Sequence, residues 1–227
     1  MLNPHDILYV DNHLLALNKP AGLVTQPSGA HEDSLESRAK EWVRQAFNKP
    51  GDVFLEAVHR IDRPVSGVVL FARTSKALSR LGAASREGDF RKVYWALVEG
   101  CPEPARGRLE HWLVHDSHHA RVVPAGAPGA RLATLDYTVR QAQGKETLLE
   151  VLLHTGRYHQ IRVQLARAGW PIVGDGRYGA RTSLPGGAIA LHHREFTVDH
   201  PVKHEPLTFT APCPDAEPWR RFTAYAR

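Results

Sequence analysis

Residues 132–168 read LATLDYTVRQAQGKETLLEVLLHTGRYHQIRVQLARA and carry the strongest fold signal in the chain. Residues 132–140 and 147–154 have strand-like composition, and no helical segment separates them. Only residues 158–168 interrupt the later strands with a helix, since Ile161, Leu165 and Ala168 recur at the spacing of one helical face. Consecutive strands with few helices between them predict an α+β fold with a largely antiparallel sheet, not an alternating doubly wound one.

Periodicity along the rest of the chain predicts further elements. Strands are expected at residues 7–10, 14–17, 67–72, 91–98 and 188–198, and helices at residues 33–47 and 75–86. The first helix is expected to begin at Asp33, whose side chain caps free N–H groups while Glu36 reciprocates three residues later. Residues 91–98 alternate in the manner of a half-buried strand. No internal repeat or linker divides the chain, so a single catalytic-type domain over residues 1–227 is predicted.

Composition favours a globular protein with an anionic partner. The chain has 227 residues, of which 42% are hydrophobic and 23% charged, and this balance excludes disorder as the default. The net charge of +5 and a pI near 9.4 point toward a polyanion without identifying one. The first ten residues hold no apolar signal core, and no stretch has the roughly 18 apolar residues of a membrane span. We therefore expect a cytoplasmic protein without membrane contact.

The segment HRIDRPVSG at residues 59–67 places cationic and imidazole groups around one carboxylate, just before a predicted strand. If residues 60–62 are extended, the side chains of Arg60 and Asp62 point to the same side. Nearby positive charge keeps such a carboxylate ionised. Taken alone, the segment fits a salt-bridged loop better than a reactive site, because structural ion pairs are common.

A second polar segment, HTGRYHQIRV at residues 154–163, joins a strand to a helix through a glycine turn. The N-terminus of such a helix presents unpaired N–H groups that suit an anion such as phosphate. Residues 157–181 hold five arginines and a single acidic residue, Asp175, so most of the surplus positive charge lies there. A solvated basic face is the alternative interpretation.

Other chemistries find no support in the sequence. The histidines that cluster along the chain are His115, His118, His119, His192 and His193. They lack the ligand spacing of a zinc site and are expected to be surface or strand residues. Neither a GxSxG elbow nor a GxGxxG or GxxxxGK[ST] loop occurs, so a serine hydrolase and a nucleotide cofactor are not indicated.

Four ordered blocks resemble the pseudouridine synthases of the RluA type. They are NKPAGL at 18–23, HRIDRPVSG at 59–67, RKVYWA at 91–96, and HTGRYHQIR at 154–162 with GWPIVGD at 169–175 and YG at 178–179. Val65 stands where the family usually has Thr, Trp170 where it usually has His, and Ile61 where it usually has Leu. None of these departures removes a group that the chemistry needs.

The resemblance implies a pseudouridine synthase catalytic fold, in which a mixed, mostly antiparallel sheet with flanking helices carries a central active-site cleft. The implied enzyme is an isomerase that converts uridine to pseudouridine in tRNA, rRNA or both, by flipping the target base. It needs no cofactor and no metal, because no group enters or leaves. The chain looks like a short member without an S4 RNA-binding domain, and we expect a monomer. A non-catalytic RNA-binding module of the same fold is the alternative.

The resemblance also assigns roles to residues. Asp62 is the catalytic carboxylate, attacking C1′ or removing a proton from C2′, and the sequence does not select between these routes. Arg162 pairs with Asp62 and keeps it charged, and Tyr94 stacks on the uracil and takes part in removing the C5 proton. Arg60 fills the space that the flipped nucleotide leaves. The remaining residues expected to bind the RNA are His59, Lys92, Arg157, His159 and Gln160.

Overall fold

The structure is a computed structural model that describes residues 2–29, 31–116 and 118–222. The chain divides into two compact units. Unit 1 comprises Met1–Phe90 and His193–Pro212, and unit 2 comprises Arg91–His192 and Cys213–Arg227. Each unit therefore contains one long continuous segment and one shorter segment from nearer the C-terminus.

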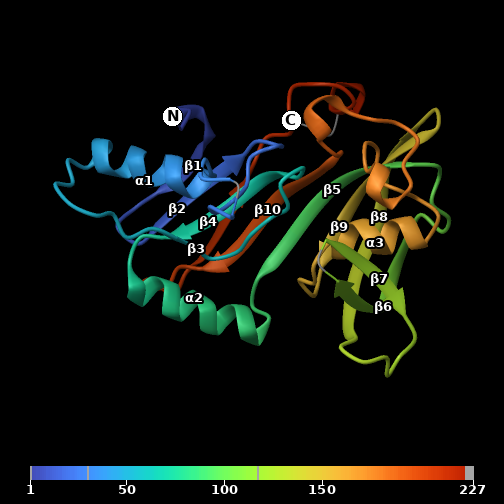
Figure 1. Ribbon diagram of the computed structural model, residues 1–227, viewed down its shortest axis with the longest axis horizontal. Helices are drawn as coiled ribbons and strands as arrows, with labels where there is room; N and C mark the ends of the chain where they lie inside the picture. The colour runs from blue at the N-terminus through green and yellow to red at the C-terminus, as the bar shows by residue number, and fades with distance from the viewer. Residues whose placement is uncertain (1, 30, 117, 223–227) are drawn as a thin grey trace. The chain divides into compact units, whose positions relative to one another are not determined.

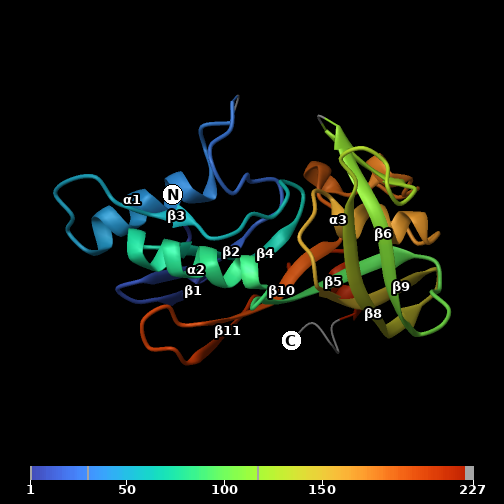
Figure 2. The ribbon, with the colours of Figure 1, turned by 90° about the horizontal axis from the view of Figure 1, so that it is seen from below.

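Unit 1 is built on a sheet in the order β1 (Ile7–Val10), β2 (Leu14–Lys19), β4 (Ser66–Ala72) and β10 (Leu191–Asp199), with β10 entering the unit at His193. The pairs β1–β2 and β2–β4 are antiparallel and lie side by side in Figure 1. Short strands β3 (Glu56–Ala57) and β11 (Pro206–Thr210) pair antiparallel with β4 and β10, and Figure 2 shows β11 beside β10. The strands predicted at residues 7–10, 14–17 and 67–72 are confirmed, and β10 begins three residues later than the predicted strand at 188–198. The strands β3 and β11 are too short to give a periodic signal.

Helix α1 (Leu35–Ala46) begins later than predicted, with Ser34 as its N-cap. Ser34 Oγ accepts a hydrogen bond from Ser37 N at 3.0 Å, and Ser37 Oγ accepts one from Ser34 N at 2.9 Å. The predicted capping by Asp33 and Glu36 is wrong, because this pair of serines satisfies the same kind of free N–H groups one residue further on. Asp33 instead forms an ion pair with Arg38, which lies in the helix.

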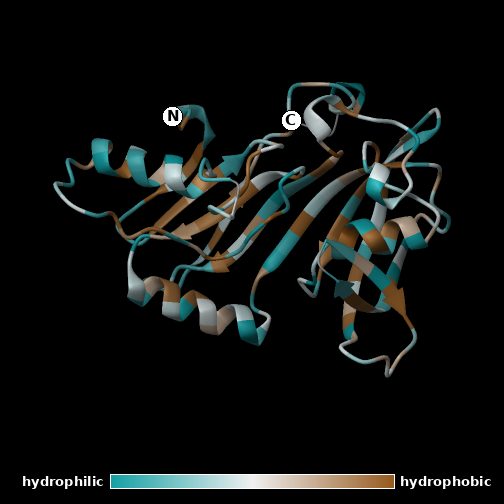
Figure 3. Cartoon of the chain, viewed as in Figure 1, coloured by the Kyte–Doolittle hydropathy of each residue, from teal (hydrophilic) through white to brown (hydrophobic). Residues whose placement is uncertain are grey.

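Helix α2 (Ser75–Glu87) closely follows the predicted range and packs on one face of the unit 1 sheet. Thr74 caps its start, and Gly88 ends it in the left-handed conformation at φ +87°. Leu81 of α2 joins a buried cluster whose other members are Leu14, Ala16, Val68, Leu70, Phe90, Phe196, Val198, Phe209 and Ala211. Hydrophobic and hydrophilic residues both occur along α2 and α3 in Figure 3, as expected for helices that cover a sheet with one side.

The backbone conformation and close packing at Gly67 explain why the HRIDRPVSG segment ends in a glycine. Its φ is +114°, which disfavours any other residue, and a Cβ atom there would lie 2.6 Å from His193 N on β10. The backbones of β4 and β10 approach each other so closely that no side chain fits between them. Gly67 therefore fixes where the loop that carries Asp62 joins the sheet.

Unit 2 contains an antiparallel sheet in the order β5, β9, β8, β6 and β7. The strands span Arg91–Glu99 (β5), Glu146–Leu153 (β9), Arg131–Gln143 (β8), Arg106–Asp116 (β6) and His119–Val123 (β7). The predicted strands are confirmed, and β6 and β7 are additional, because their many charged residues and histidines mask the apolar pattern. Tyr94 and Ala96 are buried as well as Val93 and Leu97, so the prediction of a half-buried β5 is wrong.

Helix α3 (Gln160–Arg167) follows β9, with His159 as a left-handed N-cap at φ +52°. Ile161 and Leu165 are buried as predicted. The short 3-10 helices of the structure are η1 (Pro4–Asp6), η2 (Gly176–Tyr178), η3 (Pro185–Gly187) and η4 (Trp219–Phe222). Antiparallel strands with few intervening helices agree with the predicted α+β class. No helix within residues 2–29, 31–116 and 118–222 is long and apolar enough to cross a membrane.

Candidate active site

The nine residues predicted to act in the site fall into two groups. Unit 1 carries His59, Arg60 and Asp62, and unit 2 carries Lys92, Tyr94, Arg157, His159, Gln160 and Arg162. In the sequence, the strand β4 and the helix α2 lie between Asp62 of the first group and Lys92 of the second.

The fully buried side chain of Lys19 holds the loop that carries Asp62 in place through hydrogen bonds. The Nζ of Lys19 donates to the carbonyl oxygens of Pro20 at 3.0 Å, Leu23 at 2.7 Å and Arg63 at 3.2 Å. Three carbonyls match the three donors of an ammonium group. Lys19 therefore connects the NKPAGL block to the residue that follows Asp62.

Further hydrogen bonds hold the residues on either side of Asp62. Thr25 Oγ1 donates to the carbonyl of Ile61 at 3.1 Å, and Gly22 N donates to the carbonyl of Arg63 at 2.7 Å. Burial lowers the pKa of Lys19 to about 7, and the negative charge of Asp62 opposes this shift. The half-buried carboxylate of Asp62 thus lies within electrostatic reach of a buried lysine, in a loop with a fixed backbone.

His59 and Arg60 differ in exposure. His59 Nε2 accepts a hydrogen bond from Leu70 N at 3.2 Å, and its ring centroid lies 4.5 Å from that of Phe196. His59 therefore anchors the start of the loop to the sheet, while Arg60 is exposed to solvent.

Arg162 is buried and rigidly held in unit 2. Its Nε and Nη2 donate to the two carboxylate oxygens of Asp175 at 2.7 Å and 2.9 Å. The side chains of Arg162 and Asp175 are only 6% and 2% exposed. Its Nη1 lies 2.9 Å from His159 Nε2. Three of the five N–H donors of this guanidinium are thereby fixed in direction.

The contacts of His159 determine its tautomer. A guanidinium only donates, so Nε2 of His159 accepts from Arg162, and the ring proton sits on Nδ1. Nδ1 then donates to the hydroxyl of Tyr178 at 2.8 Å, which also accepts from Ala120 N at 3.0 Å. Burial, followed by the charge of Arg162, lowers the pKa of His159 to about 3. His159 is therefore neutral at physiological pH and supports Arg162 from the side opposite Asp175.

Gln160 holds the turn before α3. Its Oε1 accepts from Thr155 Oγ1 at 2.8 Å and from Arg157 N at 3.0 Å, and its Nε2 donates to the carbonyl of Thr134 at 3.1 Å. Arg157 Nε donates to a carbonyl on β8 at 3.1 Å. The residues of the first turn of α3, from Gln160 to Val163, are buried.

The strand β5 carries two predicted site residues, Lys92 and Tyr94, and Lys92 lies beside the turn at Gly156. A Cβ atom on Gly156 would lie 3.9 Å from Lys92 Nζ, so the ammonium of Lys92 sits beside the turn. Burial lowers the pKa of Lys92. Tyr94 is two residues further along β5, which places it on the same face of the strand, and it is buried. The structure thus groups Lys92, Tyr94, Arg157, His159, Gln160 and Arg162 within unit 2.

Asp175 and Tyr178 are site residues to which the sequence assigns no role. The signal for Asp175 was present, because it is the single acidic residue between positions 157 and 181. Its pairing with Arg162 also changes the interpretation of the basic stretch. Arg162 forms a buried ion pair with Asp175, whereas Arg157, Arg167, Arg177 and Arg181 are more exposed.

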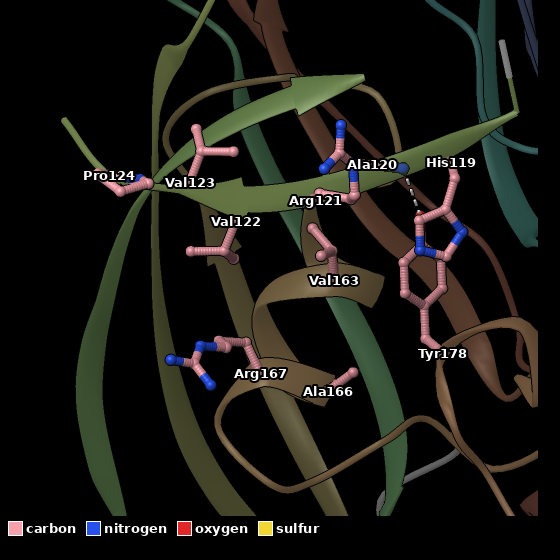
Figure 4. A pocket seen from close by; sticks show the side chains of 10 residues that line it. All are labelled: His119, Ala120, Arg121, Val122, Val123, Pro124, Val163, Ala166, Arg167 and Tyr178. Atoms are coloured by element: carbon pink, nitrogen blue, oxygen red, sulfur yellow. Dashed lines mark hydrogen bonds between the residues drawn. The ribbon is translucent and has the colours of Figure 1, made fainter. Parts of the chain in front are cut away.

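An open groove of about 660 Å³ lies between β7 and α3. Figure 4 shows Val122, Val163 and Ala166 around this space and the stacked rings of His119 and Tyr178 at one end. The Tyr178 hydroxyl that bonds to β7 is the one that bonds to His159, so the groove borders the support of Arg162. Its lining is mainly apolar.

In the part of the chain that the structure describes, no three His, Cys, Asp or Glu side chains are placed to hold a metal ion. His115 and His119 lie in strands, and His192 and His193 are buried in β10, in agreement with the expected surface or strand positions.

Comparison with known proteins identifies the family. The sequence profile described as RNA pseudouridylate synthase matches residues 13–167, which include Asp62, Tyr94 and Arg162. The chain belongs to the RNA pseudouridylate synthase family. Members of this family are isomerases, and the resemblance to the RluA type is confirmed.

Several named relatives match nearly the whole chain. It is 34% identical over 212 residues to the dual-specificity RNA pseudouridine synthase RluA of Escherichia coli, covering 91% of this chain and 92% of that protein. It is 33% identical over 228 residues to the ribosomal large subunit pseudouridine synthase D of Xanthomonas campestris, covering 93% of this chain and 67% of the relative. An uncharacterized RNA pseudouridine synthase of Synechocystis is 34% identical, and this chain spans 66% of its length.

The fold is shared with a solved pseudouridylate synthase structure. The human RNA pseudouridylate synthase domain containing 4 superposes with a TM-score of 0.78 at 22% identity, covering 93% of this chain and 89% of that one. The predicted pseudouridine synthase fold is therefore confirmed.

Proposed function

We propose that this chain isomerises uridine to pseudouridine within RNA, with Asp62 as the catalytic carboxylate and Arg162 and Tyr94 as its partners in the reaction. The family match over residues 13–167 carries this proposal, because it contains all three residues in the expected blocks. The rigid support of two of these residues agrees with it: Lys19 and Thr25 hold the loop of Asp62, and Asp175 and His159 hold Arg162.

The reaction requires an ionised carboxylate. The bond between C1′ and N1 breaks and a bond between C1′ and C5 forms, while C5 loses a proton and N1 gains one. Asp62 either attacks C1′ or removes a proton from C2′, and both steps need its negative charge. Pairing with Arg162 would favour that charge. Atoms balance without any group entering or leaving, so we propose that the reaction uses no cofactor and no metal.

The other predicted residues would bind and position the RNA. Tyr94 would stack on the uracil and assist removal of the C5 proton. Arg60, which is exposed, would fill the space left when the target nucleotide flips out, at a cost of a few kcal/mol that backbone contacts offset. Lys92 and Arg157 would meet phosphates, while His59, His159 and Gln160 would contribute mainly by holding the segments that carry these groups.

We propose tRNA, ribosomal RNA or both as the substrate. The name of the Escherichia coli relative describes dual specificity, and that of the Xanthomonas relative refers to the large ribosomal subunit. We expect the enzyme to act as a monomer in the cytoplasm and its catalytic residues to belong to a single catalytic domain.

The proposal is tested by tritium release from tRNA and ribosomal RNA transcripts that contain 5-tritiated uridine. The parent chain should release tritium, and Asp62→Ala should release none while it retains RNA binding. Asp52→Ala is the matched control, because Asp52 is an exposed carboxylate of the same unit. Normal release by Asp62→Ala would refute the assignment of the carboxylate.

The competing function is a non-catalytic RNA-binding module of the same fold. Such a module would bind the transcripts without releasing tritium. Arg162→Met separates two roles of that residue: we expect a far larger loss of turnover than of RNA affinity. Equal losses in both would make Arg162 a simple phosphate contact.

A further inference from the structure

An exposed aromatic ring lies at the entrance to α3. The side chain of Tyr158 is 39% exposed. Its ring stacks on that of His159 with the centroids 3.9 Å apart and the planes at 18°. The exposed ring of His115, on β6, approaches Tyr158 at 5.0 Å with a tilt of 40°. Two surface rings from different elements therefore meet at this point.

The backbone at this position is unusual. His159 adopts φ +52°, a conformation that few residues other than glycine use and that costs free energy. Adjacent side chains in an ordinary helix or strand point apart, whereas here the rings of Tyr158 and His159 lie parallel. The conformation thus maintains a two-ring stack whose outer member is exposed.

The stack leads directly to the buried arginine. His159 accepts a hydrogen bond from Arg162 at 2.9 Å, so the Tyr158 ring is separated from this guanidinium by one imidazole. The proposed function places Arg162 beside the reacting nucleotide. A base that stacks on Tyr158 would therefore lie close to that nucleotide.

The charge around the ring suits a nucleic acid. Arg157 precedes Tyr158, and Arg177 is exposed with its Nη1 bound to the carbonyl of His118 at 2.6 Å. Asp116, which follows His115 in the sequence, pairs with Arg121 at 3.2 Å on the surface. An exposed pair of this kind is weak, so phosphate can replace Asp116 as the partner of Arg121.

We propose that Tyr158, flanked by His115, is a stacking site for an unpaired base of the RNA near the target uridine. A planar ring beside several arginines is the usual arrangement for binding single-stranded nucleic acid, since every base has an aromatic face and each phosphate a negative charge. This inference rests on the proposed function and extends it.

The test compares variants that keep or remove the ring. Affinity is measured with a short fluorescein-labelled oligouridylate and with the tritiated transcripts. Tyr158→Phe keeps the ring and should bind like the parent. Tyr158→Leu should weaken binding by about 5-fold to 100-fold, the effect of losing one stacked base. The dependence of affinity on salt should not change, because no phosphate contact is lost.

Trp112→Leu provides the matched control. Trp112 is 36% exposed and lies three residues before His115 on β6, so it occupies the opposite face of that strand. Its replacement should leave RNA affinity at the parent value. Circular dichroism of each variant establishes that it is folded.

Three results would overturn the proposal that Tyr158 stacks on a base of the RNA. Tyr158→Leu could match the parent in both RNA affinity and turnover, Tyr158→Phe could lose as much affinity as Tyr158→Leu, or Tyr158→Leu could lose turnover at unchanged affinity. The second would indicate a hydroxyl contact, and the third a role in supporting His159 alone. Failure of the proposed function is distinguishable, because the parent chain itself would then release no tritium.

Discussion

Replacing Asp175 with alanine should strongly destabilise unit 2. The change removes both carboxylate oxygens that accept from Arg162 at 2.7 Å and 2.9 Å, and it leaves the Nε and Nη2 donors of a guanidinium that is only 6% exposed without these acceptors. Removing one member of a buried ion pair costs about 3–5 kcal/mol, because the remaining charge stays desolvated. We expect a loss of this size in the free energy of unfolding.

A double replacement separates folding from catalysis. Arg162→Met with Asp175→Leu removes both charges and fills the space with apolar groups, a change that is often close to neutral for stability. The double variant should therefore be more stable than either Asp175→Ala or Arg162→Met. It should still release no tritium, because the reaction lacks the guanidinium.

Urea denaturation followed by circular dichroism measures the stability of these variants, and tritium release measures their activity. A loss below about 1 kcal/mol for Asp175→Ala would refute the buried ion pair as a stabilising contact, since that is the range of an exposed pair. Activity in the double variant would refute a catalytic role for Arg162.

Further predictions concern other contacts of the site. Gly67→Ala should cost more than about 3 kcal/mol of stability, because a Cβ meets the backbone of His193 at a positive φ, whereas Gly51→Ala, which meets nothing within 4 Å, should have little effect in the same urea titration. Lys19→Met should cost at least about 3 kcal/mol, because three backbone carbonyls lose their donor. The pKa of His159 is lowered from 6.5 to about 3, so the unfolded chain binds one more proton than the folded chain between pH 6.5 and pH 3. The free energy of unfolding should therefore fall by up to about 1.4 kcal/mol per pH unit on acidification through this range. His159→Gln should remove this part of the pH dependence.

Local patterns predicted most of the elements but not every boundary. The strands at 7–10 and 147–154 and the helix at 75–86 are encoded by residues that are neighbours in sequence. The start of α1 was misassigned because Asp33 and Ser34 are both good caps, and only the backbone conformation at Ser34 selects between them. The strands β6 and β7 gain their stability from pairing with each other and with β8, a contribution that a single segment does not reveal.

The sequence by itself determined the family, the α+β class and the candidate residues, because ordered motifs and hydrophobic periodicity are properties of the chain. Only the tertiary structure decided how those residues are held. In that structure Lys19 donates to three backbone carbonyls and Asp175 forms an ion pair with Arg162. His159 is neutral and lies between Arg162 and Tyr178. Such pairings depend on which distant side chains are desolvated together, and the free energy of a buried charge is set by its neighbours in space rather than in sequence.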